Sequence, residues 1–163
     1  MWEASERIDI AAHPSQVWEI VADFEAHPAL AGSGEVLAVR MLDPVGLGAR
    51  FEGDVKTGEV GSFTSTNQID VFEPATELAW TSYPPLAAEE TEDHQIEVHW
   101  TFRLSHTTDG TAVEHAFAVV PPRAGAAEFA QFIERTDRVA TVRAGMLRTL
   151  QNLRSRAEAP RTQ

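Results

Sequence analysis

Three polar residues stand at positions where this sequence is otherwise apolar, and their side chains could carry chemistry. They are His115, Asn67 and Arg143. An imidazole, whose ordinary pKa is about 6.5, can shuttle a proton at an enolisable ketone. A carboxamide can orient a carbonyl group, and a guanidinium can stabilise an enolate, a phenolate or a carboxylate. Together the three would suit an enzyme that acts on a ketone.

His115 and Asn67 are assigned to an interior by alternation. His115 alternates with Val113 and Phe117, and Asn67 alternates with Ile69, which places each on the inward face of a predicted strand. A lone inward histidine is more often a satisfied core or cavity-wall residue than a catalyst. Both interpretations stay open at this point: wall residues, or a pair that orients a ligand carbonyl while His115 shuttles a proton.

Arg143 falls near the centre of an apolar stripe on a predicted C-terminal helix, beside Val139, Met146 and Leu147. Burying an unpaired guanidinium is too costly, so a carboxylate or a ligand oxyanion must meet it, or its stem must reach past the edge of the helix. We favour an internal salt bridge or a snorkelling side chain. The functional alternative is an anchor for a ligand anion.

Other kinds of site find little support. The histidines lack the close spacing of metal ligands, and there is no cysteine. The glycines between Gly46 and Gly53 lead into an alternating strand and do not open a helix, which argues against a dinucleotide site. Glu52, Asp54, Asp70 and Glu114 take the outward parity, so no pair of carboxylates faces inward. We predict no metal and no cofactor.

The composition is that of one globular domain. The chain has 163 residues, 43% hydrophobic and 23% charged, which is enough apolar material for a sizeable core. The absence of cysteine suits a reducing compartment, and no apolar run is long enough to span a membrane. The first ten residues carry charges where a signal peptide would be apolar. We therefore expect a cytoplasmic protein.

The charge argues against nucleic acid as a partner. The net charge is −12, whereas nucleic-acid binding depends on lysine and arginine. Eight of the 13 basic residues follow position 122, against four acidic residues there. We interpret the basic C-terminal segment as solvated faces and internal ion pairs. We likewise interpret the acidic stretch at residues 89–93 as a solvated loop, and as the likeliest flexible lip of any cavity.

The elements that must position these residues follow from the hydrophobic period. Residues 2–10 form a predicted strand, residues 13–23 a short helix, and residues 25–31 a second short helix that must bend or restart at Pro28. The period then changes from 3.6 to 2, with strands near 35–42, 48–56, 62–72, 77–83, 95–105 and 111–120. A long helix over residues 124–156 ends the chain.

The same patterns assign the inward-facing residues. On the strands they are Phe51, Gly53, Val55, Asn67, Ile69, Val71, Leu78, Trp80, Trp100, Phe102, Leu104, Val113, His115 and Phe117. On the long helix they are Phe129, Phe132, Ile133, Val139, Ala140, Met146, Leu147 and Leu150. The helix stripe needs an apolar partner, and only the inward face of the sheet is large enough. We predict an α+β domain over residues 1–157, in which a curved antiparallel sheet of about seven strands wraps around the helix, and a disordered tail at 158–163.

Several short segments of the sequence resemble those of the START and birch-pollen-allergen-like (SRPBCC) superfamily, in particular its polyketide cyclase/dehydratase-like branch. The similar segments are residues 13–23, 46–53, 71–80 and 100–104, the last followed by Gly110-Thr-Ala-Val113. The resemblance implies the helix-grip fold and a cavity between sheet and helix for an apolar or aromatic small molecule. Some members bind or carry the molecule, and others close and dehydrate polyketide rings. Residues 29–32, Ala-Leu-Ala-Gly, depart from the family, which commonly has an aromatic residue there.

Three functions are compatible with this sequence. The first is binding of a small hydrophobic or aromatic molecule, polyketide- or lipid-like, in an internal cavity. The second is a cofactor-free polyketide cyclase or dehydratase, in which His115 and Asn67 handle protons and the carbonyl while Arg143 stabilises an enolate. The third is a regulatory module that binds a partner and no ligand. Whether a ligand is turned over, and the oligomeric state, stay open.

The predicted cavity wall combines inward strand residues with the stripe of the terminal helix. Its members are Phe51, Gly53, Asn67, Ile69, Trp80, Trp100, Phe102, His115, Phe117, Phe129, Phe132, Ile133, Thr136, Ala140 and Arg143.

Overall fold

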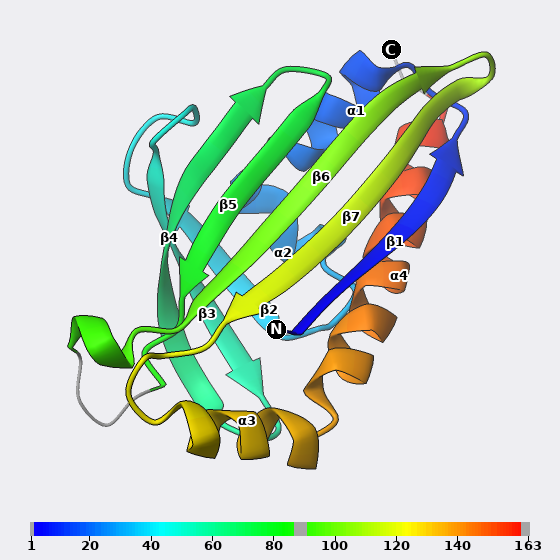
Figure 1. Cartoon of the computed structure of the whole chain (residues 1–163). Helices are drawn as coiled ribbons and strands as arrows, with labels where there is room; N and C mark the ends of the chain where they lie inside the picture. Colours follow the sequence, from blue (N-terminus) through cyan, green and yellow to red (C-terminus); the bar gives the residue numbers. More distant parts are fainter. Residues whose placement is uncertain (1, 87–90, 161–163) are drawn as a thin grey trace.

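Seven antiparallel strands form one sheet in the computed structural model, which describes residues 2–86 and 91–160 (Figure 1). The strand order is β1-β7-β6-β5-β4-β3-β2, so every neighbouring pair except β1 and β7 is consecutive in sequence. The strands are β1 (Trp2–Ile10), β2 (Val36–Met41), β3 (Arg50–Thr57), β4 (Gly61–Glu73), β5 (Glu77–Tyr83), β6 (Glu97–Thr107) and β7 (Gly110–Val120).

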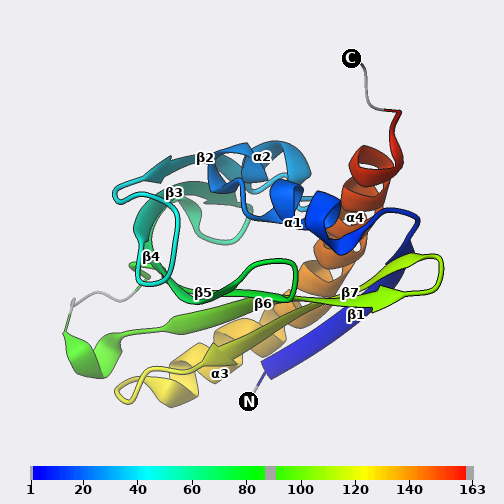
Figure 2. The ribbon, with the colours of Figure 1, turned by 90° about the horizontal axis from the view of Figure 1, so that it is seen from above.

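Within the described residues, four helices and two 3-10 turns accompany the sheet. Between β1 and β2 come α1 (Pro14–Val21), the 3-10 turn η1 (Phe24–Ala26) and α2 (His27–Leu30); η2 (Glu92–His94) precedes β6, and α3 (Ala126–Arg135) and α4 (Arg138–Glu158) follow β7. Figure 2 shows β4, β3 and β2 curling over toward α2, with α4 running across the concave side of the sheet. The predicted helix-grip architecture is confirmed.

The first short helix starts where the sequence predicts. His13 caps it, because its Nδ1 accepts a hydrogen bond from the Ser15 N–H and the Gln16 side chain accepts one from the His13 N–H. Val17 and Val21 are fully buried, and α1 is thereby held against the sheet and α4. Pro28 falls in the first turn of α2, so the second helix restarts as predicted.

A β-bulge in β4 makes the predicted inward placement of Val71 wrong. The register between β4 and β5 shifts at Asp70, after which Val71 pairs with Ala79 and Phe72 pairs with Leu78. The shift reverses the parity of the strand, so Phe72 packs against the core in place of the predicted Val71. Alternation predicted the strand correctly up to Ile69, because a bulge inserts a residue that strict periodicity does not contain.

The predicted C-terminal helix is two helices. Thr136 ends α3, and Asp137 has a left-handed backbone with φ of 50° immediately before α4. The break changes the phase of the helix, so one helical wheel over residues 124–156 assigns the wrong face. Ala140, Arg143 and Leu147 are exposed, which corrects their predicted inward placement. The inner face of α4 consists of Val142, Gly145, Met146, Thr149, Leu150 and Leu153.

The predicted disordered tail and the predicted flexible lip each lie partly outside the described residues. Glu158, predicted as the first tail residue, is the last residue of α4 and accepts a hydrogen bond from the Ala11 N–H at 2.8 Å. The end of the predicted tail, residues 161–163, lies outside the described residues, as do residues 89–90 of the predicted lip. The disordered tail and the flexible lip therefore stay predictions.

Candidate functional site

A pocket of about 270 Å³ lies between the sheet and the C-terminal helices. Its walls come from strands β2 to β7, from α2 and the segment that joins it to β2, and from α3 and α4. Both buried clusters of the core contribute to the lining, one through Phe51, Trp80 and Phe102 and the other through Phe117 and Met146. The lining is mainly aliphatic and aromatic.

Aromatic rings from three neighbouring strands form one wall of the pocket. The register pairs Trp80 with Trp100 and Trp100 with Phe117, so their side chains share a face. The Trp80 and Trp100 rings lie 6.4 Å apart at an interplanar angle of 18°. Phe102 and His115 are stacked with centroids 4.0 Å apart and planes within 5°. This wall offers flat apolar surface to an aromatic molecule.

His115 faces the pocket as predicted, with 4% of its surface exposed. Its Nδ1 lies 2.9 Å from the Thr101 carbonyl oxygen, which can only accept, so the ring proton is on Nδ1 and Nε2 is bare. Burial lowers the pKa of His115 to about 4; the bond to Thr101 acts in the opposite direction, and the nearby His27 lowers the pKa further. The imidazole is therefore neutral at pH 7.

His27 is a second imidazole in the pocket lining that the sequence analysis did not single out. Its Nε2 donates to the Val21 carbonyl at 2.7 Å, and its ring packs 4.5 Å from Phe24 and 5.5 Å from Trp80. Burial lowers its pKa, against the effects of the Val21 hydrogen bond and of Asp23. A single-turn helix that directly follows a 3-10 turn has no periodicity to indicate its inner side, so the sequence held no signal for this residue.

Asn67 lies in the pocket lining as predicted, and the protein already uses its amide hydrogens. Nδ2 contacts the carbonyl oxygens of Phe51 and Ser65, each at 3.2 Å, and the Ser65 hydroxyl at 3.2 Å. Gly53 pairs with Ser65 across the two strands, and a Cβ at Gly53 would lie 3.2 Å from the Ser65 Oγ. The small residue on β3 thus makes room for a polar pair on β4.

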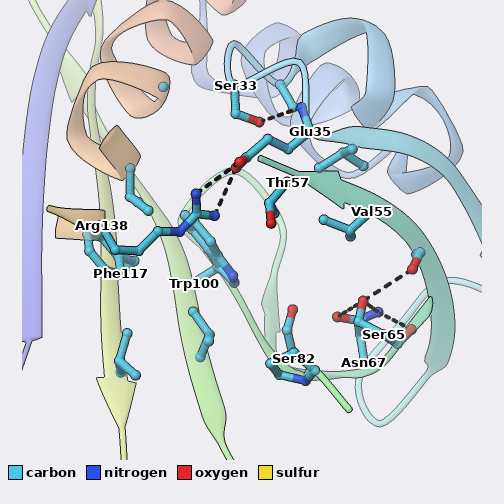
Figure 3. Close-up of a pocket in the computed structure, with 18 of the residues that line it drawn as sticks. Ser33, Glu35, Val55, Thr57, Ser65, Asn67, Ser82, Trp100, Phe117 and Arg138 are labelled. Atoms are coloured by element: carbon cyan, nitrogen blue, oxygen red, sulfur yellow. Dashed lines mark hydrogen bonds and ion pairs between the residues drawn. The ribbon is translucent and has the colours of Figure 1, made fainter. Parts of the chain in front are cut away.

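A half-buried ion pair forms another part of the lining. Arg138, at the start of α4, donates to both carboxylate oxygens of Glu35 at 2.9 and 2.8 Å, and Glu59 lies 3.9 Å away. Burial opposes ionisation of Arg138, but the hydrogen bond to Glu35 and the charges of Glu35 and Glu59 outweigh it and raise the pKa. Figure 3 shows this pair meeting at one side of the pocket, away from Ser65 and Asn67.

Most of the predicted cavity residues line the pocket. They are Phe51, Gly53, Asn67, Trp80, Trp100, Phe102, His115, Phe117, Phe129, Phe132 and Ile133. Four are placed elsewhere. Ile69 is buried in the core, the Thr136 hydroxyl donates to the Phe132 carbonyl at the end of α3, and Ala140 is exposed on α4.

Arg143, the fourth, does not reach the pocket. Its guanidinium binds the Glu6 carboxylate on β1 at 2.9 Å, and 55% of its side chain is exposed. The ion pair agrees with the structural interpretation of Arg143 and removes the residue from the predicted anchor site. The cation that the pocket does contain is Arg138, one residue beyond the helix break that the sequence analysis did not foresee.

Within residues 2–86 and 91–160, no group of three or more histidine, aspartate or glutamate side chains could hold a metal ion. Nor does any helix in those ranges combine the length and the apolar character that crossing a bilayer requires. The cytoplasmic location stays a prediction.

The curved sheet, the terminal helix and the pocket between them define a helix-grip protein of the SRPBCC type. The chain belongs to the polyketide cyclase / dehydrase and lipid transport family, whose model matches residues 1–158. No curated protein is similar enough in sequence to count as a relative.

Solved structures share the fold at low sequence identity. The di-domain ARO/CYC protein StfQ of the steffimycin pathway is 12% identical, with a TM-score of 0.70 over 96% of this chain and 51% of StfQ. The di-domain ARO/CYC protein BexL of the BE-7585A pathway is 17% identical, with a TM-score of 0.67 over 98% of this chain and 50% of BexL. TTHA0849 from Thermus thermophilus is 14% identical, with a TM-score of 0.67 over 95% of this chain and 96% of TTHA0849. The chain thus spans about half the length of the two di-domain proteins.

Proposed function

We propose that this protein binds a small, mainly apolar aromatic molecule in the pocket between its sheet and its C-terminal helices. The observation that carries the proposal is the wall of stacked rings, Trp80, Trp100, Phe102 and His115, around an unfilled volume. A core serving stability alone is packed without such voids. Family membership supports the same role, since the family is described by polyketide chemistry and lipid transport.

The size of the pocket limits the ligand. Small-molecule pockets commonly enclose about 300–1,000 Å³. At about 270 Å³, this one is at the small end, which favours a compact molecule of two or three fused rings over a long acyl chain.

Filling the pocket from one helix tests the proposal. Val142 lines the pocket, whereas Ala144 is exposed on the same helix. Binding of 2-naphthol, followed by quenching of tryptophan fluorescence, should weaken at least tenfold in Val142→Trp and stay unchanged in Ala144→Trp. Thermal unfolding of both variants establishes that they fold. Unchanged binding in a folded Val142→Trp would contradict the proposal.

A purified sample from the native host gives an independent test. Native mass spectrometry compared with the denatured mass should reveal a stoichiometric small molecule. A clean mass, together with no thermal shift across aromatic and lipid ligands, would favour the partner-binding module instead. At present the pocket weighs against that third hypothesis, which predicts no ligand-sized void.

The second candidate function is a cofactor-free cyclase or dehydratase, and His115 favours it. A neutral imidazole with a bare Nε2 can take a proton from an enolisable ketone, and burial, which lowers its pKa to about 4, makes it a weaker base than a solvated imidazole. The earlier roles of Asn67 as a donor and Arg143 as an enolate anchor receive no support, because the amide hydrogens of Asn67 are used and Arg143 binds Glu6.

Turnover and affinity separate the enzyme from the carrier. With a poly-β-ketone substrate, His115→Ala should abolish the appearance of aromatic absorbance while binding of a non-reactive aromatic ligand persists. A carrier would show no turnover in either protein, and the variant would change affinity only.

A further inference from the structure

We infer that the pocket recognises a hydroxyl hydrogen of a neutral ligand, such as a phenol or an enol, through the bare ring nitrogen of His115 or of His27, and that it disfavours carboxylates. This inference rests on the proposed function and specifies the chemistry of the ligand. No contact with Arg143 is involved.

The first step is the direction of the histidine hydrogen bonds. Both imidazoles donate their ring proton to a main-chain carbonyl, His27 from Nε2 to Val21 and His115 from Nδ1 to Thr101. Each ring therefore keeps one nitrogen without hydrogen, Nδ1 of His27 and Nε2 of His115, which can only accept. The lowered pKa values of both residues keep the two rings in this form at neutral pH.

The second step is access. Among the described residues, every inaccessible side-chain nitrogen or oxygen has a hydrogen-bond partner. Nε2 of His115 and Nδ1 of His27 have none within the described ranges, so both atoms are accessible, and both residues line the pocket. Aromatic contacts link the two rings, because Trp80 lies 5.5 Å from His27 and 6.0 Å from Phe102, which stacks on His115 at 4.0 Å. Each bare nitrogen can therefore accept a hydrogen bond from a ligand hydroxyl in the pocket.

The third step concerns the remaining polar lining. The amide hydrogens of Asn67 point to the carbonyl oxygens of Phe51 and Ser65, which leaves Oδ1 with only a 3.5 Å contact from the Ser65 hydroxyl. Asn67 thus adds another acceptor. The uncharged donors in this lining are side-chain hydroxyls, including that of Ser82, and the indole N–H groups of Trp80 and Trp100.

The fourth step is charge. Arg138 is the cation of the lining, and both of its terminal nitrogens are engaged by Glu35, with Glu59 nearby. One positive and two negative groups leave this set with a charge of −1. A bound carboxylate would find no free cation and would face excess negative charge in a desolvated site, which is unfavourable.

Three matched ligands test the inference on the unaltered protein at pH 7. They are 2-naphthol, which donates a hydrogen bond, 2-methoxynaphthalene, which has the same rings and no donor, and 2-naphthoate, which is an anion. We expect 2-naphthol to bind about tenfold more tightly than the ether, the value of one hydrogen bond, and naphthoate to bind most weakly. Equal affinities, or preference for naphthoate, would overturn the inference while leaving the proposed function intact. Binding of none would refute both.

Variants assign the preference to the histidines. His115→Phe keeps a flat ring against Phe102 and removes the acceptor, so the preference for naphthol over the ether should fall at least threefold, and further when His27→Phe is added. His106→Phe, at an exposed position, is the matched control and should keep the full preference. An unchanged preference in the double variant would show that the two ring nitrogens do not select the ligand.

Discussion

Arg138 donates to both carboxylate oxygens of Glu35 across 103 positions of sequence. The pair links the first turn of α4 to the residue before β2 and lines the pocket, with about a fifth of each side chain exposed. A second pair of the same bidentate geometry, Arg40 with Asp54, lies on the outer surface with about twice that exposure. The two pairs separate the effect of burial from that of geometry.

A double-mutant cycle should therefore give different coupling energies for the two pairs. We expect about 2 kcal/mol between Arg138→Met and Glu35→Gln, because a half-buried charge left alone is poorly solvated. For Arg40→Met with Asp54→Asn we expect a clearly smaller coupling energy, because water and salt screen an exposed pair. Urea unfolding measures both. Equal coupling in the two cycles would mean that the position of Arg138 in the pocket does not strengthen its pair.

The stability of the protein should fall as the pH falls from 6.5 to 4. Over this interval the unfolded chain takes up a proton at His115, whose ordinary pKa is 6.5, while the folded protein keeps it neutral until about pH 4. The unfolding free energy should drop by about 3 kcal/mol from this residue. His27 adds a change of the same sign.

Urea unfolding at several pH values checks this dependence. In His115→Phe the slope between pH 6.5 and 4 should be shallower, because only His27 then contributes a lowered imidazole pKa. Parallel slopes for the two proteins would show that His115 takes up its proton in the folded state as readily as in the unfolded one.

Gly32 should tolerate no side chain. A Cβ there would overlap the Cβ of Arg148 and lie 2.7 Å from the main chain of α4 at Gly145 and Thr149. Gly32→Ala must push the segment before β2 away from the helix, and we expect it to lower the unfolding free energy by about 2 kcal/mol or more. Gly46→Ala, where a Cβ meets nothing within 4 Å, should change it by less than about 0.5 kcal/mol. If both variants unfold at the same urea concentration, the close approach of the segment to α4 is not made in solution.

Arg143→Met should leave ligand binding unchanged. The guanidinium binds Glu6 and is mostly exposed, so its removal costs less than about 1 kcal/mol of stability. Fluorescence titration with 2-naphthol should give the same affinity for the variant and the unaltered protein. A loss of more than threefold in a folded variant would return Arg143 to the binding site.

The strands and their inward residues could be predicted from the sequence because a strand alternates its side chains strictly. Side-chain alternation assigns four of these residues to one face, and the strand register confirms that face: Trp80, Trp100, Phe102 and His115. The first helix was predictable from its cap and its apolar period. The alternation predicts the wrong face beyond Asp70, because the bulge there adds a residue and reverses which side chains face inward.

The polar part of the pocket could not be predicted, because it joins segments that are far apart in sequence. His27, Glu35 and Arg138 stand in a single-turn helix, a loop and the first residue after a helix break, none of which has a periodic pattern. The inner face of α4 was also hidden, since it includes Gly145 and Thr149, which an apolar stripe does not reveal.

The sequence alone therefore determined the sheet, its inner face and the presence of a terminal helix, since these follow from the local geometry of the backbone. The tertiary structure decided which charges meet. The left-handed backbone at Asp137 sets the phase of α4, and that phase turns Arg143 toward Glu6 on the outside and leaves Arg138 beside Glu35 in the pocket. Such long-range contacts depend on packing, which no local pattern encodes.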